Sequence, residues 1–231
     1  MSKKINKTYN WLSFSQSYLH LAMLGCKEML DSKHKKEQTG KFGVTSKLTY
    51  KKHDIFIPTL YNVKHGIESF IKTLKLVLAE KLSKGDLNHN VSELFDMLKQ
   101  EIKRHKIVEV IRKKYKEDSE DINLEIAYNN KIKIQDFLDD IERLILKYYH
   151  CEILKEKLGS SFSIEDVDNT AFRYPDNNLK IDIDYESVLG RITNEDIEIM
   201  MSDIDTLHKN FNALGFILEI YKQHAKKNTT K

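Results

Sequence analysis

Proline and glycine are scarce in this sequence. Its 231 residues include only 2 prolines and 8 glycines. A β-sandwich needs turn residues at short intervals, so this scarcity argues against a fold built from many short strands. Charged residues make up 32% of the chain, a proportion that suits long helices facing solvent. We therefore predict an all-α fold, organised as a single domain over residues 1–231.

Cysteines and motifs for metal or nucleotide chemistry are also few or absent. The two cysteines, Cys26 and Cys151, lack the spacing of metal ligands, and we expect both to be reduced core thiols. The motifs of HExxH metalloproteases, zinc fingers, P-loop ATPases and α/β-hydrolases do not occur. The segment Asp182-Ile183-Asp184 lacks the glycine and the distal glutamate of a calcium loop. We predict no metal and no cofactor.

Long hydrophobic runs are missing as well. No segment approaches the roughly 18 consecutive apolar residues that a membrane-spanning helix requires. The lysines near the N-terminus resemble the start of a signal peptide, but no apolar run follows them. We therefore expect a soluble, cytoplasmic protein that does not contact a membrane.

The charge is distributed unevenly along the chain. Residues 1–117 hold 24 Lys and Arg against 12 Asp and Glu, whereas residues 118–231 hold 14 against 23. Almost all the cations of the first part are lysines, which attract polyanions diffusely and in a salt-sensitive way. Two interpretations stay open. The basic part is either a face for RNA or nucleotide, or it packs against the acidic part and is partly neutralised by it.

Apolar residues at helical spacing predict five long helices. We expect them at about Thr8–Leu30, from Pro58 to Leu82, from Val91 as far as Ile111, at about Ile134–Leu158, and from Thr193 onward. The second has a continuous apolar stripe made of Leu60, Val63, Ile67, Phe70, Ile71, Leu74 and Leu78. Insertions are expected near 35–57 and 115–133, the second as a turn-rich excursion on the surface. Residues 159–192 are expected to be irregular.

Two local patterns make the region from Pro58 to Leu98 the most informative part of the chain. Glu68 and Lys72 stand four residues apart in the favourable orientation for a helical ion pair. Asn90 is a suitable N-cap for the following helix, with Glu93 three residues later. His89 lies in the turn before it, where its ring can bond nearby backbone groups.

One basic pair on the fourth predicted helix could support chemistry. Arg143 and His150 are seven positions apart, so both point the same way, outside the inward stripe of that helix. An exposed Arg and His on one face could bind a phosphodiester and activate a ribose hydroxyl. The same geometry also describes an ordinary solvated helix flank.

Three short motifs in the sequence resemble those of a known superfamily. Lys64-His65-Gly66-Ile67-Glu68 with Lys72, followed by Asn88-His89-Asn90-Val91, is similar to the prokaryotic HEPN-like helical bundles. Phe172-Arg173-Tyr174-Pro175-Asp176 resembles the Arg-Tyr-Pro-Asp element that precedes the last helix in part of that superfamily. The resemblance spans roughly Leu12 to Tyr221. It implies a bundle of four to five long helices, commonly a homodimer, in toxin–antitoxin, phage-defence or other RNA- and nucleotide-related systems.

The resemblance implies two alternative functions. Catalytic members are metal-independent ribonucleases with an Arg and a His that are separated by four to six intervening residues. Arg143 and His150 meet that spacing here, but Leu144 replaces the usual polar neighbour, and the pair precedes the Arg-Tyr-Pro element. Members with that element often lack the ribonuclease motif. We therefore expect a non-catalytic module that binds RNA, nucleotide or a partner protein encoded nearby, with Arg173, Tyr174, Lys64 and His89 as candidate contacts.

Overall fold

The structure is a computed structural model of the chain that describes residues 7–31, 55–79, 82, 89–149 and 190–226. Within these ranges the secondary structure is helical and contains no strand. The prediction of an all-α fold is therefore confirmed. Most of the segments predicted as irregular, near 35–57 and 159–192, lie outside the described residues.

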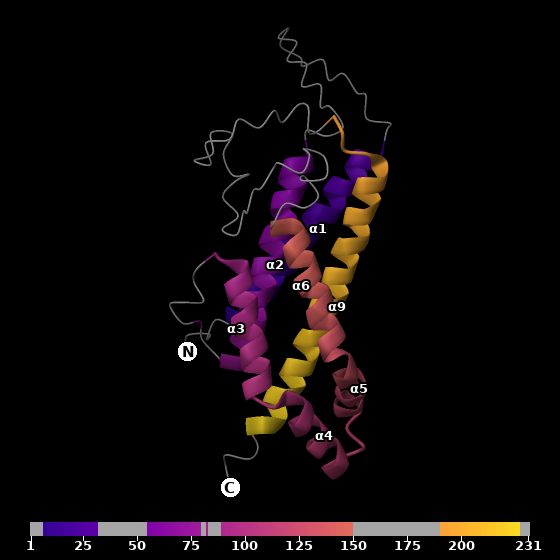
Figure 1. The fold of residues 1–231 in the computed structure, drawn as a ribbon. Helices are drawn as coiled ribbons and strands as arrows, with labels where there is room; N and C mark the ends of the chain where they lie inside the picture. The colour runs from indigo at the N-terminus through magenta and orange to yellow at the C-terminus, as the bar shows by residue number, and fades with distance from the viewer. Residues whose placement is uncertain (1–6, 32–54, 80–81, 83–88, 150–189, 227–231) are drawn as a thin grey trace, which may run out of the picture.

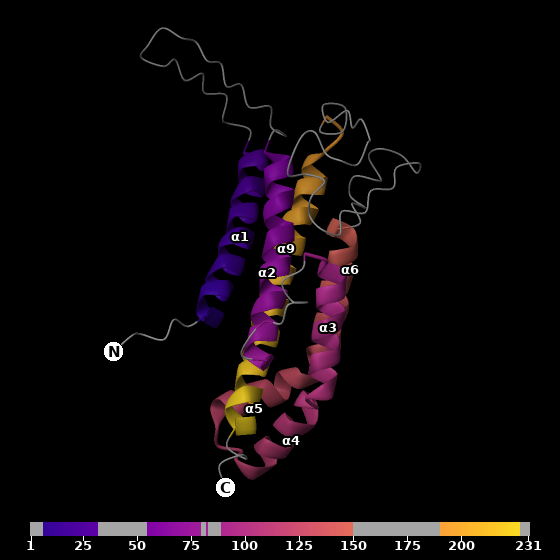
Figure 2. The same ribbon diagram turned by 90° about the vertical axis from the view of Figure 1, so that its left-hand side faces the viewer.

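The helices form an elongated bundle around α2 (Figures 1 and 2). In chain order they are α1 (Lys7–Leu30), α2 (Phe56–Ala79), α3 (Val91–Arg104), α4 (Ile107–Glu117), α5 (Ile122–Asn130), the 3-10 turn η2 (Lys131–Lys133), α6 (Ile134–Tyr149) and α9 (Asn194–Lys226). α2 packs against α1, α3, α6 and α9. The short helices α4 and α5 form one end of the bundle, beside the last turns of α9.

The apolar stripe of α2 forms the centre of the core. Its predicted members Leu60, Val63, Ile67, Phe70, Ile71 and Leu74 are each at most 1% exposed. Phe70 stacks on Phe211 of α9, with ring centroids 4.7 Å apart. The predicted stripe is therefore confirmed, and its packing explains why α2 is surrounded by other helices on most sides.

Two glycines allow α1 and α2 to lie close together. A Cβ atom on Gly25 of α1 would lie 2.1 Å from the Thr59 hydroxyl oxygen of α2. A Cβ atom on Gly66 of α2 would lie 2.5 Å from a methyl carbon of Leu19. Real Cβ atoms essentially never approach this closely, so a larger residue at either position would force the facing side chain, Thr59 or Leu19, to shift.

The last helix, α9, runs for 33 residues and about 50 Å. Its start was predicted at Thr193, whose hydroxyl accepts a hydrogen bond from the Asp196 N–H at 3.2 Å. The Asp196 carboxylate in turn accepts from the Thr193 N–H at 2.7 Å. This reciprocal pair is a capping box, and it confirms the predicted start. Neither α9 nor any other described helix is long and apolar enough to cross a membrane.

The structure differs from the prediction between residues 105 and 130. Instead of one helix to Ile111 and a surface excursion after Tyr115, α3 ends at Arg104 and two short helices follow. Asp121 caps α5 by accepting hydrogen bonds from the N–H groups of Asn123 and Leu124. Leu124 is fully buried. One side of the segment therefore contributes to the core of the bundle, although its polar composition suggested a surface excursion.

Candidate nucleic-acid interface

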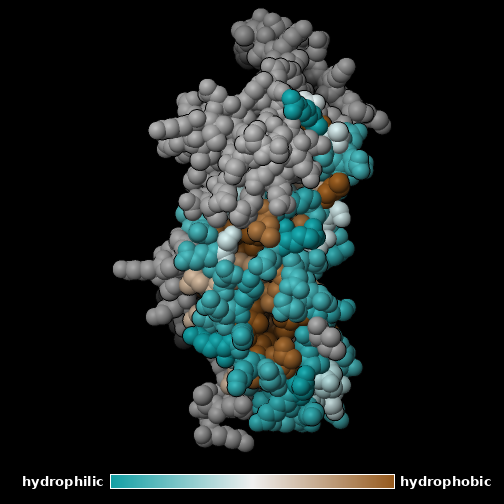
Figure 3. Space-filling model, in the orientation of Figure 1, coloured by the Kyte–Doolittle hydropathy of each residue, from teal (hydrophilic) through white to brown (hydrophobic). Residues whose placement is uncertain are grey.

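Positive charge is concentrated at the elbow between α3 and α4. Residues 103–116 contain seven Lys and Arg but only one acidic residue, Glu109. Six of the seven cations are exposed, and we call these six the basic surface: Lys103, Arg104, Lys106, Arg112, Lys113 and Lys116. The face seen in Figure 3 is mostly hydrophilic around α3 and α4, apart from a narrow hydrophobic band. Cations from two helices thus lie together at one end of the bundle.

Lys106 forms the elbow itself and has an unusual backbone conformation. It lies in the left-handed region at φ 47° and ψ 44°, and no other non-glycine residue in the described ranges has a positive φ. Its N–H donates to the Lys103 carbonyl at 3.1 Å, and its carbonyl accepts from the Val110 N–H at 3.0 Å. Glycine or asparagine is the usual residue where a helix ends this way. A lysine is therefore strained here.

Lys106 is unfavourable for a second reason, because it also stands at the N-cap of α4. Its side chain makes no capping hydrogen bond there. Asn, Asp, Ser and Thr stabilise such a position by accepting a hydrogen bond from the first turn. A positive charge also opposes the partial positive charge of a helix N-terminus. The residue thus contributes an exposed cation at the expense of local helix stability.

Ion pairs neutralise only part of this charge. Arg104 pairs with Glu101, and Lys114 pairs with Glu117 at 2.7 Å, which lowers the pKa of the Glu117 carboxyl. Lys113 lies 4.0 Å from the same carboxylate. In the described part of the chain, no carboxylate lies within ion-pair distance of the remaining four cations: Lys103, Lys106, Arg112 and Lys116. These four are free to contact an external anion.

The aromatic rings near the elbow make internal contacts. Tyr115 of α4 stacks on Tyr128 of α5, with centroids 4.3 Å apart and planes inclined by 22°. His105 lies edge-on to Tyr221 of α9, and its Nδ1 is 3.0 Å from the tyrosine hydroxyl. The first contact joins α4 to α5, and the second joins the end of α3 to α9. Each of these rings therefore already has an aromatic partner within the protein.

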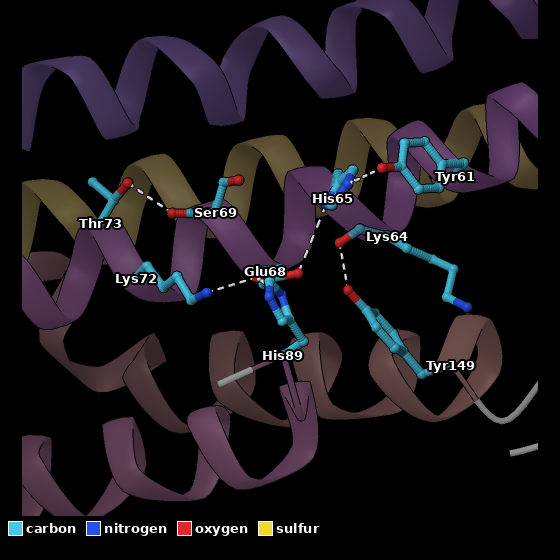
Figure 4. Close-up of polar contacts among 9 residues, drawn as sticks. All are labelled: Tyr61, Lys64, His65, Glu68, Ser69, Lys72, Thr73, His89 and Tyr149. Carbon is cyan, nitrogen blue, oxygen red and sulfur yellow. Dashed lines mark hydrogen bonds and ion pairs between the residues drawn. The ribbon is translucent and has the colours of Figure 1, made fainter. Parts of the chain in front are cut away.

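A buried carboxylate links α2 to the start of α3 (Figure 4). Glu68 is 4% exposed, and its Oε1 accepts a hydrogen bond from Lys72 Nζ at 2.6 Å. The predicted pair between these two residues is confirmed. His89 Nδ1 lies 3.0 Å from the same oxygen, although the His89 side chain is 57% exposed. Directly after His89, Asn90 accepts the Glu93 N–H at 3.1 Å, which confirms the predicted N-cap.

The second oxygen of Glu68 faces His65. The distance from His65 Nδ1 to Glu68 Oε2 is 3.7 Å, too long for a hydrogen bond, while His65 Nε2 bonds the Tyr61 hydroxyl. Burial alone raises the pKa of Glu68, but His65, Lys72 and His89 outweigh it and lower this pKa to about 2. The carboxylate therefore stays ionised at neutral pH, and it anchors a polar network inside the bundle.

Lys64 lies inside the bundle. Its side chain is fully buried, with Nζ 4.8 Å from the ring centroid of Tyr149 on α6. The Tyr149 hydroxyl donates to the Lys64 carbonyl (Figure 4). A cation over an aromatic face is a favourable contact. The structure thus places the ammonium group of Lys64 away from the surface, where the predicted contact with RNA would have to form.

The predicted catalytic pair is described only in part. Arg143 is exposed on α6, and its nearest carboxylate is that of Asp140, 3.8 Å away. Leu144, which replaces the polar neighbour of the ribonuclease motif, is buried. His150, Arg173 and Tyr174 lie outside the described residues. The ribonuclease site therefore stays a prediction.

Lys106 and the cations around it were not singled out from the sequence. The count over residues 1–117 spread the charge across more than a hundred positions and hid the dense run at 103–116. A shorter window would have found that run. The elbow could not be found in this way, because a lysine carries none of the turn signals of glycine, proline or asparagine.

Comparison with known proteins does not indicate a family or a function for this chain. No protein-family model, curated protein or solved structure matches this chain. Among the described residues, no group of three or more His, Cys, Asp or Glu side chains could hold a metal ion.

Proposed function

We propose that this chain is a non-catalytic, HEPN-like helical module that binds RNA through its basic surface. In keeping with the sequence resemblance, the proposal places it in a bacterial defence or stress-response system, as a homodimer. Support for a helical module comes from the all-α bundle and from the capped start of α3 after His89. The main support for RNA binding is the set of four exposed cations at the elbow between α3 and α4, which have no carboxylate partner among the described residues.

Phosphate is the ligand that this surface fits best. Lysine ammonium groups are compact, strongly hydrated charges that attract phosphates without fixed geometry. Each phosphate that a cation neutralises releases condensed counterions, so binding weakens steeply with salt. With four contacts, the affinity for a single strand should fall about 50-fold between 50 and 200 mM salt, because the slope is about −0.7 per contact.

A pair of charge-matched variants tests the proposal. Lys106→Gln with Arg112→Gln removes two charges from the basic surface, while Lys27→Gln with Lys209→Gln removes two exposed charges elsewhere. Lys27 lies on α1, and Lys209 lies on α9 in an ion pair with Asp205. Fluorescence anisotropy with a labelled 20-nucleotide RNA should show a salt slope about 1.4 smaller in the first variant only. Equal effects in both variants would mean that net charge alone matters, and the proposal would be wrong.

The same RNA should stay intact during these titrations. If it is cleaved by the wild type and not by Arg143→Ala, the ribonuclease alternative is favoured over the non-catalytic module. Cleavage that persists in Arg143→Ala would point to a contaminating nuclease. Gel analysis of the RNA recovered from each titration separates these results.

A further inference from the structure

We infer that the basic surface recognises the phosphate backbone of a nucleic-acid duplex rather than the bases of a single strand. This inference rests on the proposed function, because it names the form of ligand that the same surface takes. The shared chemistry is a row of phosphates held in place by base pairing, as in an RNA or a DNA duplex. Three properties of the surface support it.

The surface has no exposed stacking platform. Proteins that bind single strands combine a basic groove with exposed aromatic rings on which successive bases stack. Here Tyr115 is stacked on Tyr128, and His105 is held by Tyr221. In the described residues, the large hydrophobic side chains that are exposed all lie on helices other than α3 and α4. A single strand would therefore gain little from its bases at this surface.

The surface also lacks groups that distinguish bases by hydrogen bonding. Residues 103–116 contain no Asn, Gln, Ser or Thr. Amide and hydroxyl groups, together with arginine, make most specific contacts with base edges. Of the two arginines present, Arg104 is already paired with Glu101. What remains is mainly lysine, which positions a protein on the backbone without selecting a sequence.

The placement of the cations favours a ligand whose phosphates are already ordered. Lys106 stands at the start of α4, and Arg112 and Lys116 follow on it four residues apart, over a total rise of about 15 Å. A rigid helix holds these positions fixed. A flexible strand must lose entropy to match them, and without stacking nothing offsets this loss. A duplex presents its phosphates pre-ordered and at higher charge density.

Lys106 provides a way to separate binding from folding. Its left-handed backbone and its N-cap position both favour asparagine over lysine. Lys106→Asn should therefore raise Tm, by about 2 °C, while it weakens duplex binding and reduces the salt slope by about 0.9. A residue that served only the fold could not show both effects. Arg112→Gln, which lies on a regular part of α4, is a second variant that should weaken binding without raising Tm.

Anisotropy titrations with the full chain test the inference. The probes are a 20-base-pair RNA duplex, the matching DNA duplex and one of the RNA strands alone, each from 50 to 200 mM KCl. We expect tighter binding of both duplexes than of the strand. The slope of log affinity against log salt should be about −3.6 for the duplexes, a loss of about 150-fold over this range.

The possible failures are distinguishable. Tighter binding of the single strand than of either duplex would overturn the inference and leave RNA binding by the basic surface intact. Absence of binding to all three probes at 50 mM KCl would overturn both. If Lys106→Asn lowers Tm together with affinity, and Arg112→Gln leaves affinity unchanged, the elbow is structural and the basic surface is not the site.

Discussion

Replacing Glu68 by glutamine should destabilise the protein by an amount that depends on pH. The substitution keeps the size of the side chain but removes the negative charge that Lys72 and His89 contact at 2.6 and 3.0 Å. Lys72 is itself only 3% exposed, and in the described part of the chain its other recorded contact is with the ring of Trp11, 5.8 Å from Nζ. A buried cation that loses its partner is strongly destabilising.

The expected magnitude follows from the pKa of Glu68. Its neighbours lower this pKa from 4.5 to about 2. One pKa unit corresponds to about 1.4 kcal/mol, so the ionised form contributes about 3 kcal/mol to the free energy of unfolding at neutral pH. Because the folded-state pKa lies below the ordinary value, this contribution is complete above about pH 5. It is lost as pH falls toward 2.

Urea unfolding followed by circular dichroism at several pH values measures this effect. The difference between wild type and Glu68→Gln should be about 3 kcal/mol at pH 7 and should shrink steadily below pH 5. The double variant Glu68→Met with Lys72→Met is a useful control, because replacing both members of a buried pair by apolar residues is often nearly neutral. A difference that stays constant from pH 7 to pH 3 would refute the assigned ion pairs.

Two further predictions concern glycines and a thiol. Gly66→Ala should destabilise the protein by about 2 kcal/mol, because its new Cβ would lie 2.5 Å from a leucine side chain of α1. Gly215→Ala should instead stabilise α9 by about 0.5 kcal/mol, since its Cβ would meet a side chain of α2 at an ordinary contact distance of 3.5 Å. In thermal melts, the first variant should therefore lower Tm and the second should raise it. Burial raises the pKa of the Cys26 thiol to about 12, so little reactive thiolate is present at pH 8. In a Cys151→Ser variant, an aromatic disulfide reagent at pH 8 should therefore modify Cys26 no faster than the protein unfolds. Rapid labelling of the folded protein would show that α1 is not packed as described.

Local patterns in the sequence predicted most of the helices correctly. The stripe of α2, the Glu68–Lys72 pair and the caps at Asn90 and Thr193 depend on residues three or four positions apart. Such spacings fix neighbours on a helix whatever the tertiary fold. The contact between His89 and Glu68 spans 21 residues and two helices. It depends on how α2 and α3 pack, so local spacing could not predict it.

The two main surprises contradict ordinary preferences of lysine. Lysine is almost never fully buried unless it is paired, so an exposed site was the natural prediction for Lys64. Inside the bundle it contacts Tyr149, 85 residues further along the chain. Lysine is also rare in left-handed backbone, so a continuous helix through Lys106 was the natural prediction there. For Lys64, a contact between distant parts of the chain thus overrides the local preference.

The placement of α9 has a consequence for synthesis of the chain. This helix packs against α1, α2, α4, α5 and α6, yet it leaves the ribosome after all of them. The α1–α2 hairpin can form early, because its partners are close in sequence and meet directly at Gly25 and Gly66. The surfaces of α4, α5 and α6 that contact α9 have to wait for it. Until α9 is synthesised, these apolar faces remain open to water, to chaperones or to other nascent chains.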